Sequence, residues 1–371
     1  MSEEYVTRIV LETNPFYDGE EEFIAVDEDS NIPSTNLLRG EDGPQEGEDK
    51  VEDTSSKYKT ESPSPRRSSY GWTSAEGAKG ILKYAANPTK RIPTGLWPID
   101  NMIGGGVGIG EVCVVVGKSG SGKSYVGQNI MENNLEVPAV FFSFEMPGPM
   151  LITRSMAMWS GKTHNEVFDM IEQNKIDPEM LEDWEDSHRN HFYVTKTGLD
   201  LDCMSQVLQE SEEILGTKPA LVVIDYMELV AAVANGDSST IDNVTSLAQL
   251  LKGWAKKENV ATVLLHQTNK SLRHGDAPDD DSARYGGFTE ADIVIGVWRP
   301  HKWEPKTKSD SPMVDHTREY LKKFFGINLI KNRPKIELNE QGYLVPIQAS
   351  GKLDAPKNKV LEKVIPGQGM F

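Results

Sequence analysis

The chain has 371 residues, enough to bury a large hydrophobic core in one or two domains. Its net charge of −18 is concentrated near the N-terminus: residues 1–70 hold 18 Asp and Glu against 7 Lys and Arg, a balance of −11, which leaves −7 for the other 301 residues. This acidity does not exclude a basic channel for nucleic acid elsewhere, because a local patch governs phosphate contact. Apolar runs are too short for a membrane helix and no signal peptide is present, which predicts a soluble, cytoplasmic protein.

Residues 1–70 are rich in Glu, Asp, Ser, Gly and Pro and lack sustained periodicity, which predicts an acidic, largely disordered tail. Residues 71–90 form a predicted linker helix, because small and apolar residues recur there at helical spacing behind a Thr/Ser cap. Such a helix needs a surface that covers its apolar face. It could fold back on its own domain or dock on a neighbouring subunit, and the sequence leaves both possibilities open.

A Gly-rich loop at residues 117–124 reads Gly-Lys-Ser-Gly-Ser-Gly-Lys-Ser and directly follows the apolar run of residues 112–116. This order is typical of a phosphate-binding loop, in which backbone N–H groups and the dipole of the next helix bind phosphate. We expect Lys123 to reach the β- and γ-phosphates of ATP and the Ser124 hydroxyl to coordinate Mg²⁺. Lys118 and Ser119 occupy variable positions of the motif and have no specific role of their own. The predicted nucleotide-binding residues are Gly117, Ser119, Gly120, Ser121, Gly122, Lys123, Ser124 and Tyr125.

Three further apolar runs end in polar residues, at the position where open parallel sheets bind their ligands. They are residues 139–144 before Glu145, 221–224 before Asp225, and 260–265 before His266 and Gln267. In a phosphate-loop enzyme Asp225 would bind Mg²⁺ through water, although Asp at a strand end is often only a helix cap. Gln267 is placed to sense the γ-phosphate, or equally to cap the segment that follows.

The alternation of strands and helices predicts an α/β fold with a doubly wound, mainly parallel sheet over residues 91–350. Strand-like pieces at residues 327–331, 335–338 and 343–347 predict a C-terminal antiparallel hairpin. Residues 351–371 are expected to be a flexible tail. The two cysteines, Cys113 and Cys203, are interpreted as small buried hydrophobes rather than as a disulfide or metal pair.

Several motifs follow one another in a particular order. They are Thr94-Gly95-Leu96 with Asp100, the phosphate loop, Phe144-Glu145-Met146, Ile224-Asp225-Tyr226, His266-Gln267-Thr268, Ala291-Asp292-Ile293 and Lys331-Asn332-Arg333. Together they resemble the ATPase domain of the DnaB-type replicative hexameric helicases, within the wider RecA-like class, over about residues 90–350. The loop alone is generic, whereas the Phe-Glu-Met strand end and the Lys-x-Arg pair are more particular. The resemblance implies a RecA-like fold that uses ATP and Mg²⁺.

The resemblance also assigns roles to single residues. Glu145 resembles the general base that polarises the attacking water, Asp225 the Mg²⁺ partner and Gln267 the sensor, while Glu228 is a competing base. Lys331 and Arg333 resemble a pair inserted into the neighbouring subunit's site, where Arg stabilises charge developing on the γ-phosphate. An ordinary solvated hairpin edge is the alternative for this pair. The predicted catalytic residues are Lys123, Glu145, Gln267, Lys331 and Arg333.

DNA would pass through the centre of a ring, contacted by the segments at residues 236–240 and 270–284. Basic side chains and backbone N–H groups would hold phosphates there without reading sequence. The predicted DNA-binding residues are Lys270, Arg273 and Arg284. Asp276 and residues 279–281 lie in the same loop and make its net charge unfavourable for this role.

The leading hypothesis is therefore an ATP-driven ring, expected to be a homo-hexamer, that translocates on single-stranded or forked DNA and separates the duplex. One alternative is a RecA-like recombinase or annealing ATPase that forms filaments, and another is a KaiC-like ATPase that is not a motor. Full-length members of the family carry a helical N-terminal domain that recruits primase, and the acidic tail stands in its place here. Primase or a loader is a further candidate partner. The architecture resembles a bacteriophage replication protein, which would act in the host cytoplasm.

Overall fold

The computed structural model describes residues 73–75, 77–79, 90–225, 240–268, 271–282, 290–304, 315–333, 342–353 and 362–364. The chain divides into two compact units, one of residues 18–88 and the other of residues 1–17 and 89–371. In the first unit, residues 74–75 and 77–79 are helical, within the predicted linker helix. The rest of that helix and the predicted acidic tail lie outside the described residues.

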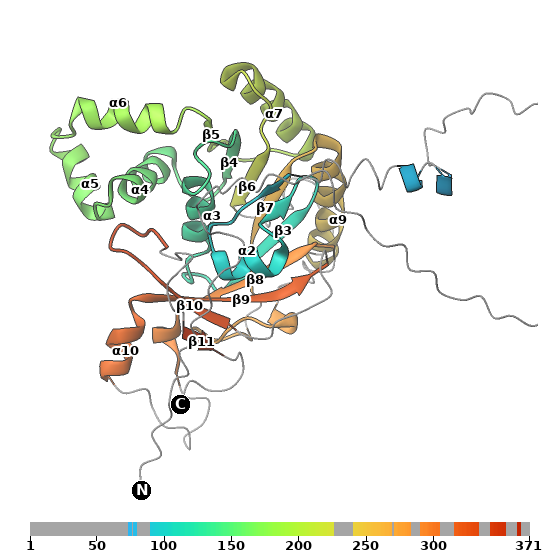
Figure 1. Cartoon of the computed structure of the whole chain (residues 1–371). Helices are drawn as coiled ribbons and strands as arrows, with labels where there is room; N and C mark the ends of the chain where they lie inside the picture. Colours follow the sequence, from blue (N-terminus) through green and yellow to red (C-terminus); the bar gives the residue numbers. More distant parts are fainter. Residues whose placement is uncertain are drawn as a thin grey trace, which may run out of the picture. The chain divides into compact units, whose positions relative to one another are not determined.

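The second unit is built on a sheet whose described strands have the order β11-β10-β9-β8-β3-β7-β6-β4-β5 (Figure 1). Neighbouring strands from β8 to β5 are parallel, and β9, β10 and β11 extend the sheet in antiparallel pairing. A short antiparallel pair, β1 (Arg91–Ile92) and β2 (Val107–Gly108), precedes it in the chain. The strands are β3 (Val112–Gly117), β4 (Ala139–Ser143), β5 (His191–Val194), β6 (Leu221–Asp225), β7 (Ala261–Gln267), β8 (Ile293–Trp298), β9 (Phe324–Asn332), β10 (Gly342–Pro346) and β11 (Glu362–Val364).

This topology confirms the predicted α/β fold with a mainly parallel sheet and C-terminal antiparallel strands. β9 begins three residues before the predicted piece at residues 327–331 and pairs with β8 on one side and β10 on the other. The predicted piece at residues 335–338 lies outside the described residues. The sequence does not predict β11, which falls in the segment expected to be a flexible tail.

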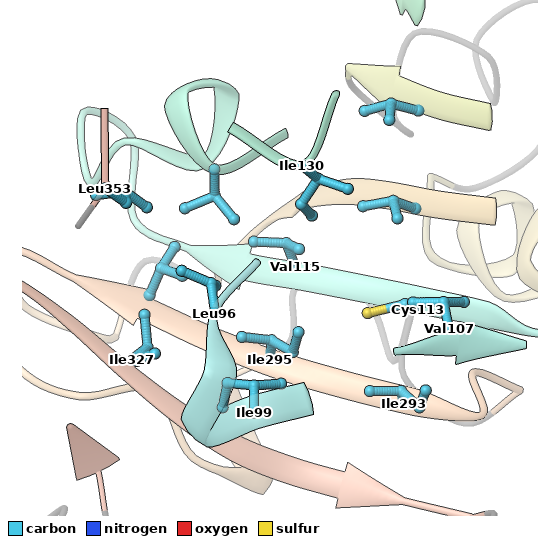
Figure 2. Close-up of a cluster of buried hydrophobic side chains, with 14 of the residues drawn as sticks. Leu96, Ile99, Val107, Cys113, Val115, Ile130, Ile293, Ile295, Ile327 and Leu353 are labelled. Atoms are coloured by element: carbon cyan, nitrogen blue, oxygen red, sulfur yellow. The ribbon is translucent and has the colours of Figure 1, made fainter. Parts of the chain in front are cut away.

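Helices cover both faces of the sheet. Cys113 and Val115 of β3 belong to a core that includes residues of α2 and α3, whereas Val112 and Val114 belong to a second core with residues of α7 and α9. Figure 2 shows the first core. Because both faces are covered, the parallel strands appear in the sequence as continuous apolar runs. The helices are α2 (Trp97–Ile103), α3 (Lys123–Glu132), α4 (Gly148–Ser160), α5 (His164–Glu172), α6 (Pro178–Ser187), α7 (Leu201–Leu215), α9 (Thr240–Glu258) and α10 (Asp315–Leu321).

The two cysteines form no disulfide, with Cys113 buried and Cys203 half-buried. Within the described part of the chain, no helix is long and apolar enough to cross a membrane.

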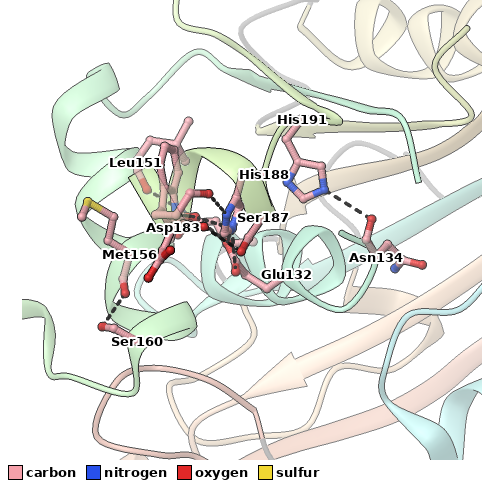
Figure 3. Close-up of polar contacts among 12 residues, drawn as sticks. Glu132, Asn134, Leu151, Met156, Ser160, Asp183, Ser187, His188 and His191 are labelled. Atoms are coloured by element: carbon pink, nitrogen blue, oxygen red, sulfur yellow. Dashed lines mark hydrogen bonds and ion pairs between the residues drawn. The ribbon is translucent and has the colours of Figure 1, made fainter. Parts of the chain in front are cut away.

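Helices α4, α5 and α6 lie to one side of the sheet and share a small hydrophobic core (Figure 1). A buried polar network fastens α4 and α6 to α3 (Figure 3). Glu132 at the end of α3 accepts a hydrogen bond from Ser155 of α4 and lies 3.1 Å from Nε2 of His188. Trp184 of α6 donates from Nε1 to Ser155 Oγ over 3.2 Å. Because buried polar groups are costly when unpaired, these contacts fix α4 firmly beside α3.

Candidate nucleotide site

The loop between β3 and α3 contains glycines that a residue with a side chain could not replace. Gly122 has a φ of 98°, and a Cβ there would meet the Phe325 ring at 2.0 Å. At Gly117 a Cβ would come within 2.3 Å of Ser121 Oγ. α3 begins directly after this loop, and the first N–H groups of a helix lack partners within it and favour an anion. The predicted phosphate loop therefore has the strand, loop and helix context that such a site requires.

Strand register explains why residues far apart in sequence meet at the loop. In the parallel pairs, Gly117 lies opposite Gln267, and Asp225 lies opposite Ser143 and Leu265. Their carboxyl ends therefore form one edge of the sheet, where a cavity of about 420 Å³ opens. Its lining comprises Ser119, Gly120, Gly122, Lys123, Ser124, Tyr125, Glu145, Met146, Arg154, Asp225 and Gln267. Of the predicted nucleotide-binding residues, Gly117 and Ser121 are not part of this lining.

Lys123 and Ser124 are held inside the site. The Lys123 ammonium donates to the carbonyl oxygens of Gly117 and Lys118 over 3.0 and 3.3 Å. Carbonyl oxygens are weak partners for a cation compared with phosphate, so this ammonium can move to a nucleotide's phosphates. The Ser124 side chain is hydrogen-bonded to Asp225.

Burial makes the ionised form of the Asp225 carboxyl group unfavourable. It is 1% exposed, and burial raises the pKa of its carboxyl group to about 6, although the hydrogen bond from Ser124 opposes this rise. Glu145 nearby raises this pKa further, whereas Lys123 lowers it. One carboxylate oxygen, Oδ2, has no hydrogen-bond partner among the described residues. A carboxylate with an unsatisfied oxygen beside a hydroxyl fits Mg²⁺, which takes few protein ligands and keeps several waters.

Arg154 is a site residue that the sequence analysis missed. It lies in the middle of α4, and its guanidinium stacks over the Tyr125 ring, 4.8 Å from the centroid. Its Nη1 donates to the sulfur of Met146 over 2.8 Å. A signal was present, because Arg154 is the only charged residue in the α4 sequence. Arg154 lies in a helix, however, and the pattern that predicts ligand sites applies to polar residues at the ends of parallel strands.

A second cavity, of about 350 Å³, adjoins the other side of the loop and shares Gly120, Gly122 and Tyr125 with the first. Arg299 stacks over the Phe325 ring in this cavity, 4.8 Å from the centroid. Its remaining lining comprises His164, His301, Lys302, Ile347, Gln348, Ala349, Ser350 and Gly351. These residues come from the first turn of α5, a short 3-10 helix (Pro300–Lys302) and the segment after β10, and no sequence motif marked them.

The structure does not bring Lys331 and Arg333 to this site. Lys331 lies opposite Val294, and the N–H of Arg333 donates to the carbonyl of Asp292, at the beginning of β8. Through β8, Lys331 is therefore level with Val114 of β3, three residues before the loop, and Arg333 is level with Val112, five residues before it. These separations are about 10 and 17 Å at roughly 3.3 Å per residue. Partial burial, together with the charges of Arg333 and Lys252, lowers the pKa of Lys331. The pair therefore lies at the opposite edge of the sheet from the nucleotide cavity of its own chain.

Of the predicted DNA-binding residues, only Arg273 is described. Its guanidinium donates to the carbonyl of Glu304 and lies 3.6 Å from a carboxylate oxygen of Asp276. Lys270 and Arg284 lie outside the described residues, as do the competing base Glu228 and nearly all of the first predicted DNA segment.

Comparisons with known proteins agree on the fold. The family model of the DnaB-like helicase C-terminal domain matches residues 91–334. The ATPase domain of G40P has a TM-score of 0.63 and 15% identity, covering 76% of this chain and 99% of that chain. A DnaB-like replicative helicase, described with its interactions with primase, has a TM-score of 0.59 and 15% identity, covering 76% of this chain and 67% of that chain. A search of curated protein sequences finds no significant match.

Proposed function

Because residues 91–334 place the chain in the family of DnaB-like helicase C-terminal domains, we propose that it is an ATP-driven DNA helicase. It would assemble as a ring, translocate on single-stranded DNA during replication, and separate the duplex. One observation carries the proposal. The phosphate loop, Glu145, Asp225 and Gln267 converge on one cavity, whereas Lys331 and Arg333 lie at the opposite edge of the sheet.

The residues of the cavity suit phosphoanhydride hydrolysis. The nucleotide's phosphates would bind at the N-terminus of α3, with Lys123 leaving the loop carbonyls to contact the β- and γ-phosphates. Ser124 and Asp225 would hold Mg²⁺, which neutralises phosphate charge when bound. Glu145 would accept a proton from the attacking water, and Gln267 would contact the γ-phosphate. Glu145 lines the cavity itself, as a base that acts on this nucleotide must.

The second cavity would hold the base and ribose of the same nucleotide. It begins at Gly120, Gly122 and Tyr125, where the phosphate cavity ends, so one extended ligand can occupy both. Arg299 and Phe325 offer a stacked pair against which a planar base can pack.

The position of Lys331 and Arg333 supports an oligomeric enzyme. Neither can reach the phosphate loop of its own chain, but in a head-to-tail ring each would face the site of the next subunit. An arginine supplied in trans makes hydrolysis depend on assembly. We propose a hexamer, with single-stranded or forked DNA in the central channel and a primase or loader as a further partner.

The proposal is tested by electron microscopy of the protein with an ATP analogue and single-stranded DNA, and by strand displacement from a forked duplex. Closed six-fold rings and ATP-dependent displacement support it, with the Lys123→Ala variant as the inactive control. Open filaments that exchange strands without unwinding would contradict the helicase and indicate a recombinase. ATP turnover that does not respond to single-stranded DNA would indicate a non-motor ATPase.

A further inference from the structure

Asp292, the residue just before β8, joins β3, β9 and α9 at the edge of the sheet opposite the nucleotide cavity. Its N–H donates to the carbonyl of Val112 in β3 over 2.9 Å, and its own carbonyl accepts the N–H of Arg333 over 2.7 Å. Its carboxylate accepts the N–H of Val112 over 3.0 Å and lies 2.6 Å from the ammonium of Lys252 in α9. The backbone of Arg333 is therefore attached to β3 and α9 through Asp292.

The ion pair between Lys252 and Asp292 is largely buried. The two side chains are 14% and 12% exposed, and the Lys252 ammonium also donates to the carbonyl of Glu290 over 3.2 Å. Leu251 and Ala255, which flank Lys252 on α9, belong to the second hydrophobic core. An ion pair in such surroundings keeps a fixed geometry, and removal of one partner leaves the other charge without compensation.

Both residues of the proposed trans pair lie beside this ion pair. β9 ends one residue before Arg333, whose side chain is exposed. Its backbone position is therefore set by the strand end and by the hydrogen bond to Asp292. Burial lowers the pKa of Lys331, and among its charged neighbours Lys252 lowers this pKa further while Asp292 raises it. The ion pair is thus close to the Lys331 ammonium as well as to the backbone of Arg333.

We propose that the Lys252–Asp292 ion pair is a positioning element that holds the end of β9 where Arg333 can reach the nucleotide site of the neighbouring subunit. This inference rests on the proposed shared site. Neither Lys252 nor Asp292 is part of the lining of the two nucleotide cavities of its own chain. Their role should therefore appear in turnover and not in nucleotide affinity. A misplacement of about 1 Å in a catalytic group can cost about 10²-fold in rate.

The test compares the full-length protein with its Lys252→Met variant, which keeps the apolar stem of the side chain but not its charge. With single-stranded DNA, Mg²⁺ and ATP, we expect turnover to fall roughly 10- to 100-fold, while ATP affinity stays within about 3-fold of the wild type. Lys252→Arg keeps a charged donor for Asp292 and should lose less turnover than Lys252→Met. Undiminished turnover in Lys252→Met, or an equal loss of ATP affinity, would overturn the inference.

Mixing experiments decide on which side of the shared site the defect lies. In mixed rings, Lys252→Met subunits supply intact nucleotide cavities and Lys123→Ala subunits supply a correctly placed Arg333. Turnover of this mixture should exceed that of either variant alone. A mixture of Lys252→Met with Arg333→Ala should show no gain, because every Arg333 in it is displaced or absent. A structural defect in the variant's own cavity would not be corrected by Lys123→Ala protein, and that result would contradict the positioning role.

Ser205→Ala is the matched control on the same helix. The Ser205 hydroxyl accepts a hydrogen bond from Trp254 over 2.9 Å and donates to Glu258 over 2.7 Å, and these contacts attach α9 to α7. The variant should have a lower free energy of unfolding but unchanged turnover. A loss of turnover equal to that of Lys252→Met would mean that loosening α9 in general is sufficient, and the inference would fail. If Lys252→Met does not fold, Lys252→Gln carries the same tests, with a smaller loss because its amide can still donate to Asp292.

The mixture of Arg333→Ala with Lys123→Ala separates this inference from the proposed function. If this mixture regains turnover but the mixture of Lys252→Met with Lys123→Ala does not, only the positioning role is refuted. If neither mixture regains turnover, the shared site itself is refuted, and the inference that rests on it falls too. Gains in both mixtures support the shared site and the positioning role together.

Discussion

Replacement of Asp225 by Asn should stabilise the nucleotide-free protein at neutral pH while it abolishes Mg²⁺-dependent hydrolysis. Burial raises the pKa of Asp225 from 3.8 to about 6, so at pH 7.5 the native state holds an ionised carboxylate in an unfavourable environment. This difference corresponds to about 3 kcal/mol, at roughly 1.4 kcal/mol per pH unit. The Asn amide leaves a buried N–H short of partners, which costs about 1 to 2 kcal/mol. We expect a net gain of about 1 to 2 kcal/mol in the free energy of unfolding.

The gain should depend on pH in a defined direction. Because the pKa of Asp225 is higher in the native state, that state binds more protons than the unfolded chain between pH 3.8 and about 6. The contribution of Asp225 to stability therefore falls as the pH rises through this window. The Asp225→Asn variant has no carboxyl group that ionises here. Its free energy of unfolding should therefore exceed that of the wild type by the full amount above about pH 6, and this difference should disappear near pH 4.

The assay is chemical unfolding without nucleotide or metal across this pH range, followed by the same measurement at pH 7.5 with Mg²⁺ and ATP. Asp100→Asn is the matched control. The pKa of Asp100 is also raised to about 6 by burial, but its carboxylate accepts hydrogen bonds from Thr94 N, Thr94 Oγ1 and Gly95 N. An amide cannot accept all three, so this variant should be destabilised. An Asp225→Asn protein that is less stable than the wild type at pH 7.5 without ligand, or whose advantage does not change with pH, would refute the reasoning.

Three further substitutions test separate parts of the site. Glu145→Gln should bind ATP nearly as tightly as the wild type but turn it over about 10²- to 10⁴-fold more slowly, so a comparable loss of affinity would argue against a proton acceptor. Arg333→Ala should keep ATP binding and lose about 10³-fold in turnover, with activity restored by mixing with Lys123→Ala protein; undiminished turnover in the single variant would exclude a trans role. Gly122→Ala should lower the free energy of unfolding by about 2 to 4 kcal/mol and weaken nucleotide binding, because the added Cβ would overlap the Phe325 ring and the φ of this residue is positive. Gly161→Ala is the control, since its φ is also positive but nothing lies within 4 Å of the added Cβ, and equal unfolding free energies would contradict the overlap argument.

The centre of the site could be predicted from the sequence because a parallel strand buried on both faces is a distinctive apolar run. Glu145, Asp225 and Gln267 each follow such a run, and the carboxyl ends of parallel strands meet at one edge of the sheet. The strand order β7-β6-β4 beside β3 then places them around one cavity. The strand ends and the loop motif are therefore sufficient to predict that these residues meet at one cavity, without knowledge of the strand order.

Other parts of the site could not be predicted, for physical reasons. Arg154 lines the cavity from α4, whose apolar pattern predicts which side of the helix is buried but not what its single charged residue contacts. Arg299 and Gly351 come from segments without a repeating pattern, and only tertiary packing brings them to the phosphate loop. The apolar pattern of β9 also does not predict whether the strand runs parallel or antiparallel to β8, because the pattern is the same in both orientations.

The direction of β9 has a mechanical consequence. At its beginning, Phe325 packs against Gly122 of the phosphate loop, and at its end lie Lys331 and Arg333. The intervening strand is hydrogen-bonded on both sides, to β8 and β10, so it behaves as a strut of about 30 Å, at roughly 3.3 Å per residue, that resists stretching. In the proposed ring, each strut would run from one nucleotide to the next. Release of phosphate at one site would then displace Lys331 and Arg333 at the neighbouring site. The nucleotide sites of the ring would therefore be mechanically coupled rather than independent.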